Sequence, residues 1–282
     1  MKNILLPTDF SENSWNAIKY AINFFEKEAC NFYMLNVSRF DNFMNSDSPY
    51  VAPGETIEEA YTKPAKLQLR NILKRINKEF LPNKKHKFYT LADYNFFIES
   101  VRKQVEEKKI DFIVMGTKGA SGLKKIIVGS NTGDVITKVK CTTLAIPEQA
   151  KFVRLEEIAF PTDFSLTYDI QILEPLSEIL ENQQSTLRIL HISKKRADLD
   201  SDQHKNKELL EDYFIHFKPS FHYLTNKKVE DAIQCFVESR SINMICMVAK
   251  NLNYFQQILF HSKVEAISYH TEVPFLVLHE KN

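Results

Sequence analysis

The chain contains little glycine. It has 6 glycines among 282 residues, where average usage of about 7% would give roughly 20. One stretch of 18 residues holds five of the six, and residues 134–282 contain none; the five are Gly116, Gly119, Gly122, Gly129 and Gly133. Glycine allows backbone conformations and close approaches that a Cβ atom blocks. We therefore look for a binding function in this stretch first.

Other features are absent as well. No apolar run approaches the roughly 20 residues that span a bilayer. The formal net charge is only +1, so no overall field favours nucleic acid or an anionic membrane. The segment Met1–Pro7 lacks the longer apolar stretch of a signal peptide and is typical of a first strand. We expect a cytoplasmic protein that binds neither nucleic acid nor membrane.

The cysteines and histidines show no metal-binding or disulfide pattern. The four cysteines are Cys30, Cys141, Cys235 and Cys246, and none forms a C-x-x-C pair. Free, buried thiols are the simplest interpretation in a reducing compartment. No cluster of His, Cys, Asp and Glu has metal-ligand spacing, and no Ser/His/Asp set can be inferred from one sequence. The sequence thus predicts no metal ligands and no catalytic residues.

A long internal repeat divides the chain. Pro7–Ser11 (PTDFS) recurs as Pro161–Ser165, 154 residues later, whereas Asp111–Met115 parallels Asn243–Met247 at an offset of 132. The difference between 154 and 132 makes the second copy 22 residues shorter. The polar stretch Arg39–Glu59 is the predicted loop that this copy lacks. A repeat of this length indicates duplicated domains, since solenoid repeats are about 20–50 residues long.

The two predicted domains are residues 1–149 and 150–282, each with alternating strands and helices. Short apolar runs predict strands at 2–6, 32–37, 87–91, 111–115 and 142–146, and at 156–160, 186–192, 220–224, 242–248 and 274–278. Apolar faces with helical spacing are Trp15, Ile18, Ile22 and Phe25; Leu69, Ile72, Leu73, Ile76 and Phe80; and Phe97, Val101 and Val105. A fourth helix is expected to begin near Ser130 and to bury Val135, Ile136 and Val139. The predicted fold class is α/β, with two tandem, doubly wound, mostly parallel five-stranded sheets flanked by helices.

The glycine-rich stretch has the spacing G-x2-G-x9-G-S-N-T. It lies between a predicted strand and a predicted helix, and its members are Gly116, Gly119, Gly129, Ser130, Asn131 and Thr132. Glycines let backbone N–H groups approach an anion, and the helix start adds free N–H groups and a favourable dipole. Lys118, Lys124 and Lys125 place positive charge nearby, although the last two also suit a solvated surface patch. The pattern is neither a Walker A loop nor a Rossmann G-x-G-x-x-G.

With this spacing the chain resembles the universal stress protein family over nearly its whole length. The family's nucleotide-binding members carry G-x2-G-x9-G-[ST], a P-x-D after the first strand, matched by Pro7-Thr8-Asp9, and a valine ending the second strand, matched by Val37. The resemblance implies that Asp9 and Val37 hold the ribose and adenine of ATP, with Mg²⁺ carried by the phosphates. It further implies a pocket lined by Met115, Gly116, Lys118 and Gly119, and phosphates held by Gly129, Ser130, Asn131 and Thr132. Because the family usually dimerises through its fifth strands, it also implies an internal pseudo-dimer of the two domains, and a homodimer stays open.

The second copy departs from the pattern. Val248–Phe255 stands in place of the glycine loop, and His261-Ser262 replaces Gly129-Ser130. A left-handed backbone costs a non-glycine residue roughly 1–2 kcal/mol, and the bulky side chains of that loop would crowd phosphates. We predict that only the first copy binds nucleotide in the family's manner.

Plainer interpretations stand beside these. Asp9 could help Ser11 cap the first helix, and the second copy keeps the same motif without the loop. His191, in a predicted strand, is more typical of a hydrogen-bonded core histidine than of a ligand-binding one.

The predicted function is that of an ATP-binding stress-response sensor or regulator, and not of an enzyme. A weak ATPase or phosphotransferase is the first alternative, because a phosphate cradle is present but no convincing base. A nucleotide-independent interaction protein is the second.

Overall fold

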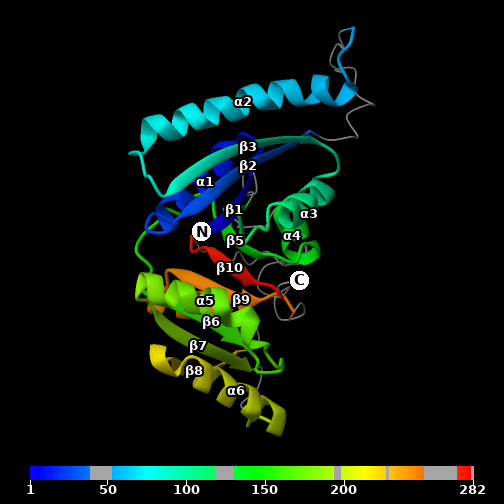
Figure 1. The fold of residues 1–282 in the computed structure, drawn as a ribbon. Coiled ribbons are helices and arrows are strands. Elements are labelled where there is room, and N and C mark those ends of the chain that lie inside the picture. Colours follow the sequence, from blue (N-terminus) through cyan, green and yellow to red (C-terminus); the bar gives the residue numbers. More distant parts are fainter. Residues whose placement is uncertain (39–52, 118–129, 194–197, 227–228, 251–271, 281–282) are drawn as a thin grey trace. The chain divides into compact units, whose positions relative to one another are not determined.

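The computed structural model describes residues 1–38, 53–117, 130–193, 198–226, 229–250 and 272–280, and it divides the chain into two compact units, Met1–Gly116 and Thr117–Asn282. We describe each unit by itself. Figure 1 gives the course of the chain and labels the helices and strands.

The first unit alternates strands and helices. In order it contains β1 (Lys2–Pro7), α1 (Glu12–Phe24), β2 (Cys30–Ser38), α2 (Ile57–Glu79), β3 (His86–Tyr94), α3 (Phe97–Glu107) and β4 (Phe112–Gly116). All its strand pairs are parallel, in the order β3-β2-β1-β4. In Figure 1, α2 runs along β2 and β3, and these elements are in contact. The central β1 is fully buried at Ile4, Leu5 and Leu6.

The second unit begins with the end of the first repeat copy and continues through the second. It contains α4 (Ser130–Lys138), β5 (Thr142–Ile146), β6 (Glu157–Thr162), α5 (Ile170–Gln183), β7 (Thr186–Ser193), α6 (Ser201–Tyr213), a 3-10 turn (Ile215–Phe217), β8 (Ser220–Thr225), α7 (Val229–Ser239), β9 (Met244–Val248) and β10 (Phe275–Leu278). Its strand order is β5-β10-β9-β6-β7-β8. Every pair is parallel except β5–β10, which is antiparallel.

These elements confirm the predicted fold class, a mostly parallel α/β architecture flanked by helices. Each predicted strand is present, and the boundaries shift by up to three residues. The predicted fourth helix is α4, and it buries Val135, Ile136 and Val139. One boundary is wrong: the expected loop Arg39–Glu59 stops at Thr56, because α2 begins at Ile57. The hydroxyl of Thr56 accepts from Glu59 N, and the Glu59 carboxylate accepts from Thr56 N, so a capping box fixes this helix start.

The boundary of the compact units differs from the boundary of the sequence repeat. The repeat places the division after residue 149, and the compact units meet between Gly116 and Thr117. The hydrogen bonds explain the difference, because β5 pairs with β10 through Leu144 and Leu276. The fifth strand of one copy therefore groups with the fifth strand of the other. The domain ranges 1–149 and 150–282 describe the duplication and stay a prediction.

Candidate functional site

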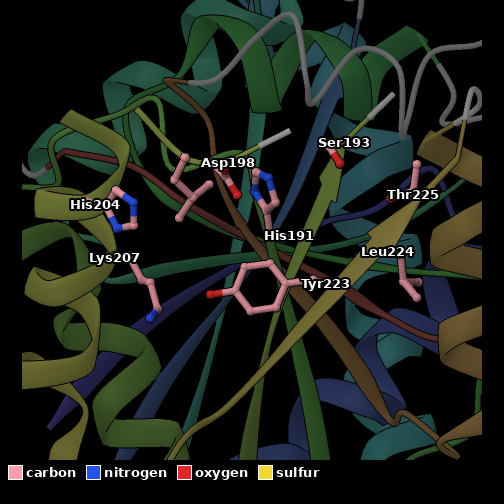
Figure 2. Close-up of a pocket in the computed structure, with 9 residues that line it drawn as sticks. His191, Ser193, Asp198, His204, Lys207, Tyr223, Leu224 and Thr225 are labelled. Carbon is pink, nitrogen blue, oxygen red and sulfur yellow. The ribbon is translucent and has the colours of Figure 1, made fainter. Parts of the chain in front are cut away.

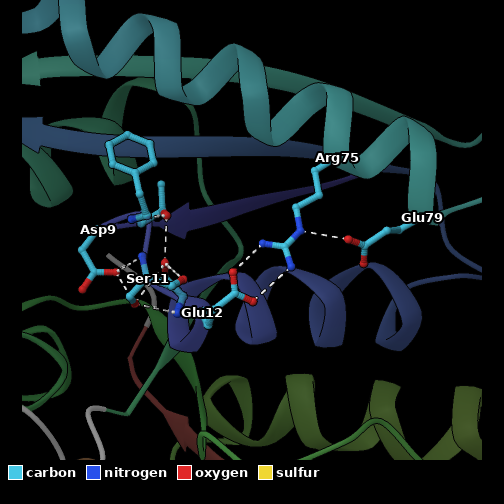
Figure 3. A network of polar contacts seen from close by, with 8 residues as sticks. Asp9, Ser11, Glu12, Arg75 and Glu79 are labelled. Carbon is cyan, nitrogen blue, oxygen red and sulfur yellow. Dashed lines mark hydrogen bonds and ion pairs between the residues drawn. The ribbon is translucent and has the colours of Figure 1, made fainter.

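The repeated PTDFS segment forms a tight turn between β1 and α1. Phe10 has a left-handed backbone, with φ of 65°, and its N–H donates to Thr8 Oγ1 at 3.1 Å. Asp9 Oδ1 accepts from Ser11 N at 3.1 Å and from Ser11 Oγ at 2.6 Å. Ser11 in turn caps α1 by accepting from Ser14 N. Figure 3 shows this network, in which Asp9 holds the residue that begins the helix.

The second copy builds the same turn with the same hydrogen bonds, although α5 begins only at Ile170 and is capped by Asp169. Phe164 has φ of 56°, and its N–H donates to Thr162 Oγ1 at 2.9 Å. Asp163 Oδ1 accepts from Ser165 N at 3.0 Å and from Ser165 Oγ at 2.7 Å. The turn therefore accounts for the repeated aspartate without any ligand. The plainer interpretation of Asp9 is correct in substance, although Ser11 is the cap and Asp9 braces it.

Asp9 nevertheless presents a charged oxygen at the end of β1. Burial would raise the pKa of Asp9, but the hydrogen bonds from Ser11 outweigh it and hold that pKa below its usual range. The side chain is exposed, so an ionised carboxylate can accept hydrogen bonds from a ligand's hydroxyl groups.

Several other predicted residues lie at the carboxyl ends of neighbouring strands. Pro7 ends β1 and is buried, Val37 lies next to the end of β2 and is half-buried, and Met115 and Gly116 end β4. Because the strand order is β2-β1-β4, these ends are adjacent, which is where parallel α/β sheets bind ligands. Thr8, by contrast, is buried and serves the turn.

Gly116 has a specific steric reason to be glycine. A Cβ at this position would lie 2.7 Å from Asn13 Nδ2 and 2.8 Å from Asn13 Oδ1. The backbone that leaves β4 thus passes against the side-chain amide of Asn13, and a larger residue at this position would require that amide to move. This close approach begins the predicted glycine loop.

The end of that loop lies in the second unit. Helix α4 begins at Ser130, and Asn131 in its first turn is exposed while Thr132 is buried. Such a helix start favours an anion. The predicted site residues Lys118, Gly119 and Gly129 lie outside the described residues.

Comparison with known proteins identifies the family. Residues 1–147 match the model of the universal stress protein family. The chain belongs to this family. It is 31% identical over 153 residues to universal stress protein MJ0531 of Methanocaldococcus jannaschii, covering 53% of this chain and 84% of that protein. It is 28% identical over 155 residues to MJ0577 of the same organism, covering 51% and 94%.

The tandem arrangement also has a structural counterpart. A universal stress protein from Archaeoglobus fulgidus matches with a TM-score of 0.66 at 20% identity, covering 98% of this chain and 97% of that one. At this identity the likeness shows the fold alone. Among the described residues of this universal stress protein, no helix is long and apolar enough to cross a membrane, and no group of three His, Cys, Asp or Glu side chains could hold a metal ion.

The end of β9 in this universal stress protein can be compared with the end of β4. Thr117 N donates to Ile146 O at 2.8 Å, and Ala249 N donates to Leu278 O at 2.9 Å. These equivalent hydrogen bonds place Val248 where the first copy has Gly116. Lys250 then forms an ion pair with Glu280. The predicted crowding by Leu252, Tyr254 and Phe255, and the replacement by His261, lie outside the described residues.

His191 is the hydrogen-bonded, buried histidine that the sequence suggested. It is 7% exposed, its Nδ1 lies 3.2 Å from Thr162 O, and its ring stacks on Phe164 with centroids 5.1 Å apart. Asn36 plays the same part in the first unit, where its Nδ2 donates to Thr8 O at 2.8 Å. Asn36 of β2 and His191 of β7 thus contact the carbonyl of the corresponding threonine and brace the same turn in the two copies.

A charged bridge that the sequence did not reveal holds α1 and α2 together. Arg75 donates to both carboxylate oxygens of Glu12, at 2.7 and 3.0 Å, and to Glu79 at 2.8 Å (Figure 3). Its guanidinium also lies 4.2 Å from the centroid of the Trp15 ring. Glu12 and Arg75 are 63 positions apart in the sequence, and this separation leaves no local signal from which the pair could have been inferred. The bridge steadies the helix that follows the Asp9 turn.

Proposed function

We propose that this universal stress protein is a nucleotide-responsive regulator whose first repeat copy binds ATP. The observation that carries the proposal is the loop G-x2-G-x9-G-S, which starts at a glycine packed against the side-chain amide of Asn13 and ends at the first turn of α4. The second copy has valine at the position of Gly116, so the proposal assigns nucleotide binding to the first copy alone.

The residues fit an adenine nucleotide in stated roles. The exposed Asp9 carboxylate would accept hydrogen bonds from ribose hydroxyls, and the half-buried Val37 would contact the base. Met115 and Gly116 form the wall at the end of β4. Together with Ser130, Asn131 and Thr132, the loop residues Lys118, Gly119 and Gly129 would hold the phosphates, which bring Mg²⁺ with them. Since its duplicate Asp163 makes the same turn, Asp9 carries less of the proposal than the glycine loop does.

Other members of the family contain adenine nucleotides. One universal stress protein from Archaeoglobus fulgidus has been solved with dAMP, and another universal stress protein with cAMP. Their TM-scores, 0.33 and 0.38, are too low to support a comparison of sites. The proposal rests on the loop of this chain.

Binding without turnover is part of the proposal. Nucleotide would shift the equilibrium between two conformational or oligomeric states by the ratio of its affinities for them. The proposal also includes a cytoplasmic location for the protein. It further includes an internal pseudo-dimer of the two copies, in which β5 pairs with β10.

Thermal unfolding with and without Mg-ATP tests the proposal. Trp15, the only tryptophan, lies in α1 and reports on the first unit. At 100 times Kd, ATP should stabilise the folded state by about 2.7 kcal/mol, a shift of several degrees. A Gly129→Val variant should lose the shift.

An unchanged wild-type unfolding curve, from protein shown to be free of nucleotide, would refute ATP binding. Phosphate release measured on the same samples separates the roles, because steady turnover that Gly129→Val abolishes would show an enzyme. If Gly129→Val retains the ATP-dependent shift in unfolding temperature, ATP binds at a site other than this loop.

A further inference from the structure

The second unit contains an open cavity of about 660 Å³ beside α6. The sheet side of the cavity is formed by His191 and Ser193 of β7 and by Tyr223 and Thr225 of β8. His191 pairs with Tyr223 and Ser193 with Thr225, so all four side chains share one face of the sheet. The volume lies within the range of about 300–1,000 Å³ that holds small ligands.

The first unit fills the equivalent space with aromatic rings. Ser38 of β2 pairs with Tyr94 of β3, just as Ser193 pairs with Thr225. Tyr94 stacks on Tyr61 of α2 with ring centroids 4.7 Å apart, and Ser38 Oγ donates to the Tyr61 carbonyl at 3.1 Å. The second unit has a threonine where the first has this tyrosine. The cavity is therefore a specific departure from its duplicate, at a position where the duplicate shows that a large ring can be accommodated.

His191 offers a fixed hydrogen-bond acceptor to the cavity. Because the Thr162 carbonyl can only accept, the proton of the neutral ring sits on Nδ1, 3.2 Å away, and Nε2 keeps its lone pair. Burial lowers the pKa of His191, which favours the neutral ring. Stacking on Phe164 holds its plane. A ligand hydroxyl or N–H group is the partner that such a nitrogen selects.

Helix α6 and the loop before it supply the charged groups. Lys207 is half-buried, with its Nζ 5.3 Å from the Phe221 ring centroid, and it forms no ion pair within the described part of the chain. His204 and Asp198 also line the cavity, and Figure 2 shows His204 and Lys207 on the helix side, across from Tyr223. Among the described residues that line the cavity, Lys207 supplies an ammonium group and Asp198 a carboxylate, and the ammonium group can pair with an acid group of a ligand.

We propose that this cavity binds a small hydroxylated carboxylate of the sugar-acid class. The carboxylate of the ligand pairs with Lys207, and its hydroxyl groups donate to His191 Nε2 and exchange hydrogen bonds with Ser193 and Thr225. The sheet side of the cavity lies at the end of β7, the counterpart of the end of β2, whereas a family glycine loop in this unit would follow β9. In the order β9-β6-β7-β8, the midline of β7 and β8 lies about 12 Å from β9 at about 4.8 Å per strand. The cavity therefore occupies the counterpart of the base-contacting end of a nucleotide site rather than of its phosphate loop.

The test is an NMR titration of the histidine ring signals in the full chain with gluconate. Sorbitol keeps the hydroxyl groups and lacks the carboxylate, whereas acetate keeps the carboxylate and lacks the hydroxyl groups. Gluconate should bind with a Kd of about 1 mM, the affinity expected for a ligand of this size. Sorbitol and acetate should bind at least about tenfold more weakly, since each lacks half of the recognised groups.

Two variants and a matched control locate the site. Lys207→Met should weaken gluconate binding about tenfold or more. The control Lys205→Met removes an exposed positive charge from the same helix, where Lys205 pairs with Asp202, and it should leave gluconate binding unchanged. Thr225→Tyr should abolish binding by refilling the space. Thr225 is exposed, so this variant should fold, which its circular dichroism verifies.

Equal effects of Lys207→Met and Lys205→Met, unaltered binding by Thr225→Tyr, or ring signals that never saturate would each overturn the proposal. This result is independent of the ATP proposal, because ATP binding is measured with a different ligand and through the emission of Trp15 in the first unit.

Discussion

His279, which follows β10, should make the second unit sensitive to mild acid. Burial lowers the pKa of His279 to about 4, and a hydrogen bond with the Ile136 backbone opposes this shift without reversing it. Its Nε2 is buried with no hydrogen-bond partner in the part of the chain that the structure describes. A protonated imidazole would therefore place a charge on a buried nitrogen of this half-buried side chain.

The size of the effect follows from the two pKa values. In the unfolded chain a histidine takes up its proton near pH 6.5, whereas in the folded protein His279 stays neutral until about pH 4. The contribution of neutral His279 to the free energy of unfolding is therefore fully present above pH 6.5, and it is lost as the pH falls toward 4. Between pH 7 and pH 5 the loss is about 2 kcal/mol, and it reaches about 3 kcal/mol below pH 4. Burial also lowers the pKa of His191 and of His222, which adds to the loss in the same direction.

Urea unfolding of wild type and His279→Asn, at pH 7 and at pH 5, measures the effect. A fluorophore on Cys235, an exposed cysteine in α7, follows the second unit, while Trp15 emission follows the first. Asparagine keeps a polar side chain and cannot titrate, so the variant should lose about 2 kcal/mol less than wild type on acidification. If both proteins lose the same stability between the two pH values, His279 is not a buried neutral group and the reasoning is wrong.

The sequence predicted the elements well because burial leaves a local pattern. The apolar runs of β1 and β5 are nearly fully buried, so their hydrophobicity marks them. The predicted third strand, 87–91, was too short, because β3 extends to Tyr94 through its register with Ser38. The extension, Ala92-Asp93-Tyr94, is interrupted by a charged residue and forms no apolar run, and its pairing with β2 makes it part of the strand. Backbone pairing between distant segments leaves no mark in composition.

The candidate site was predictable in part, for a related reason. The spacing of the glycines marked the loop, and the structure adds a contact that favours glycine at Gly116: the side chain of Asn13, more than a hundred residues earlier, occupies the space that a Cβ would take. The motif containing Asp9 was ambiguous, because a turn and a ribose contact both need a carboxylate there. The second copy distinguishes the two roles, because Asp163 makes the same turn there without a glycine loop beside it. The cavity beside α6 was not foreseen, since it arises from a missing ring at Thr225 rather than from a motif.

Three further predictions follow from particular contacts. Gly116→Ala should destabilise the first unit by about 1–3 kcal/mol, as overpacking does, and adding Asn13→Ala should restore most of the loss; equal stability of the single and double variants in urea would contradict the steric argument. Of the four cysteines only Cys235 is exposed, so a thiol reagent should modify one site per native chain rapidly, and mass spectrometry should find it in α7. The duplicated turn offers a matched pair, Asp9→Asn and Asp163→Asn. Because the two carboxylates accept equivalent hydrogen bonds from the serine two residues on, each change should cost its own unit about 1 kcal/mol. Only Asp9→Asn should also weaken Mg-ATP binding, measured by calorimetry, since only Asp9 stands beside a glycine loop. Equal ATP affinity in the two variants would reduce Asp9 to a brace for the turn and leave the phosphate loop to bind the nucleotide without it.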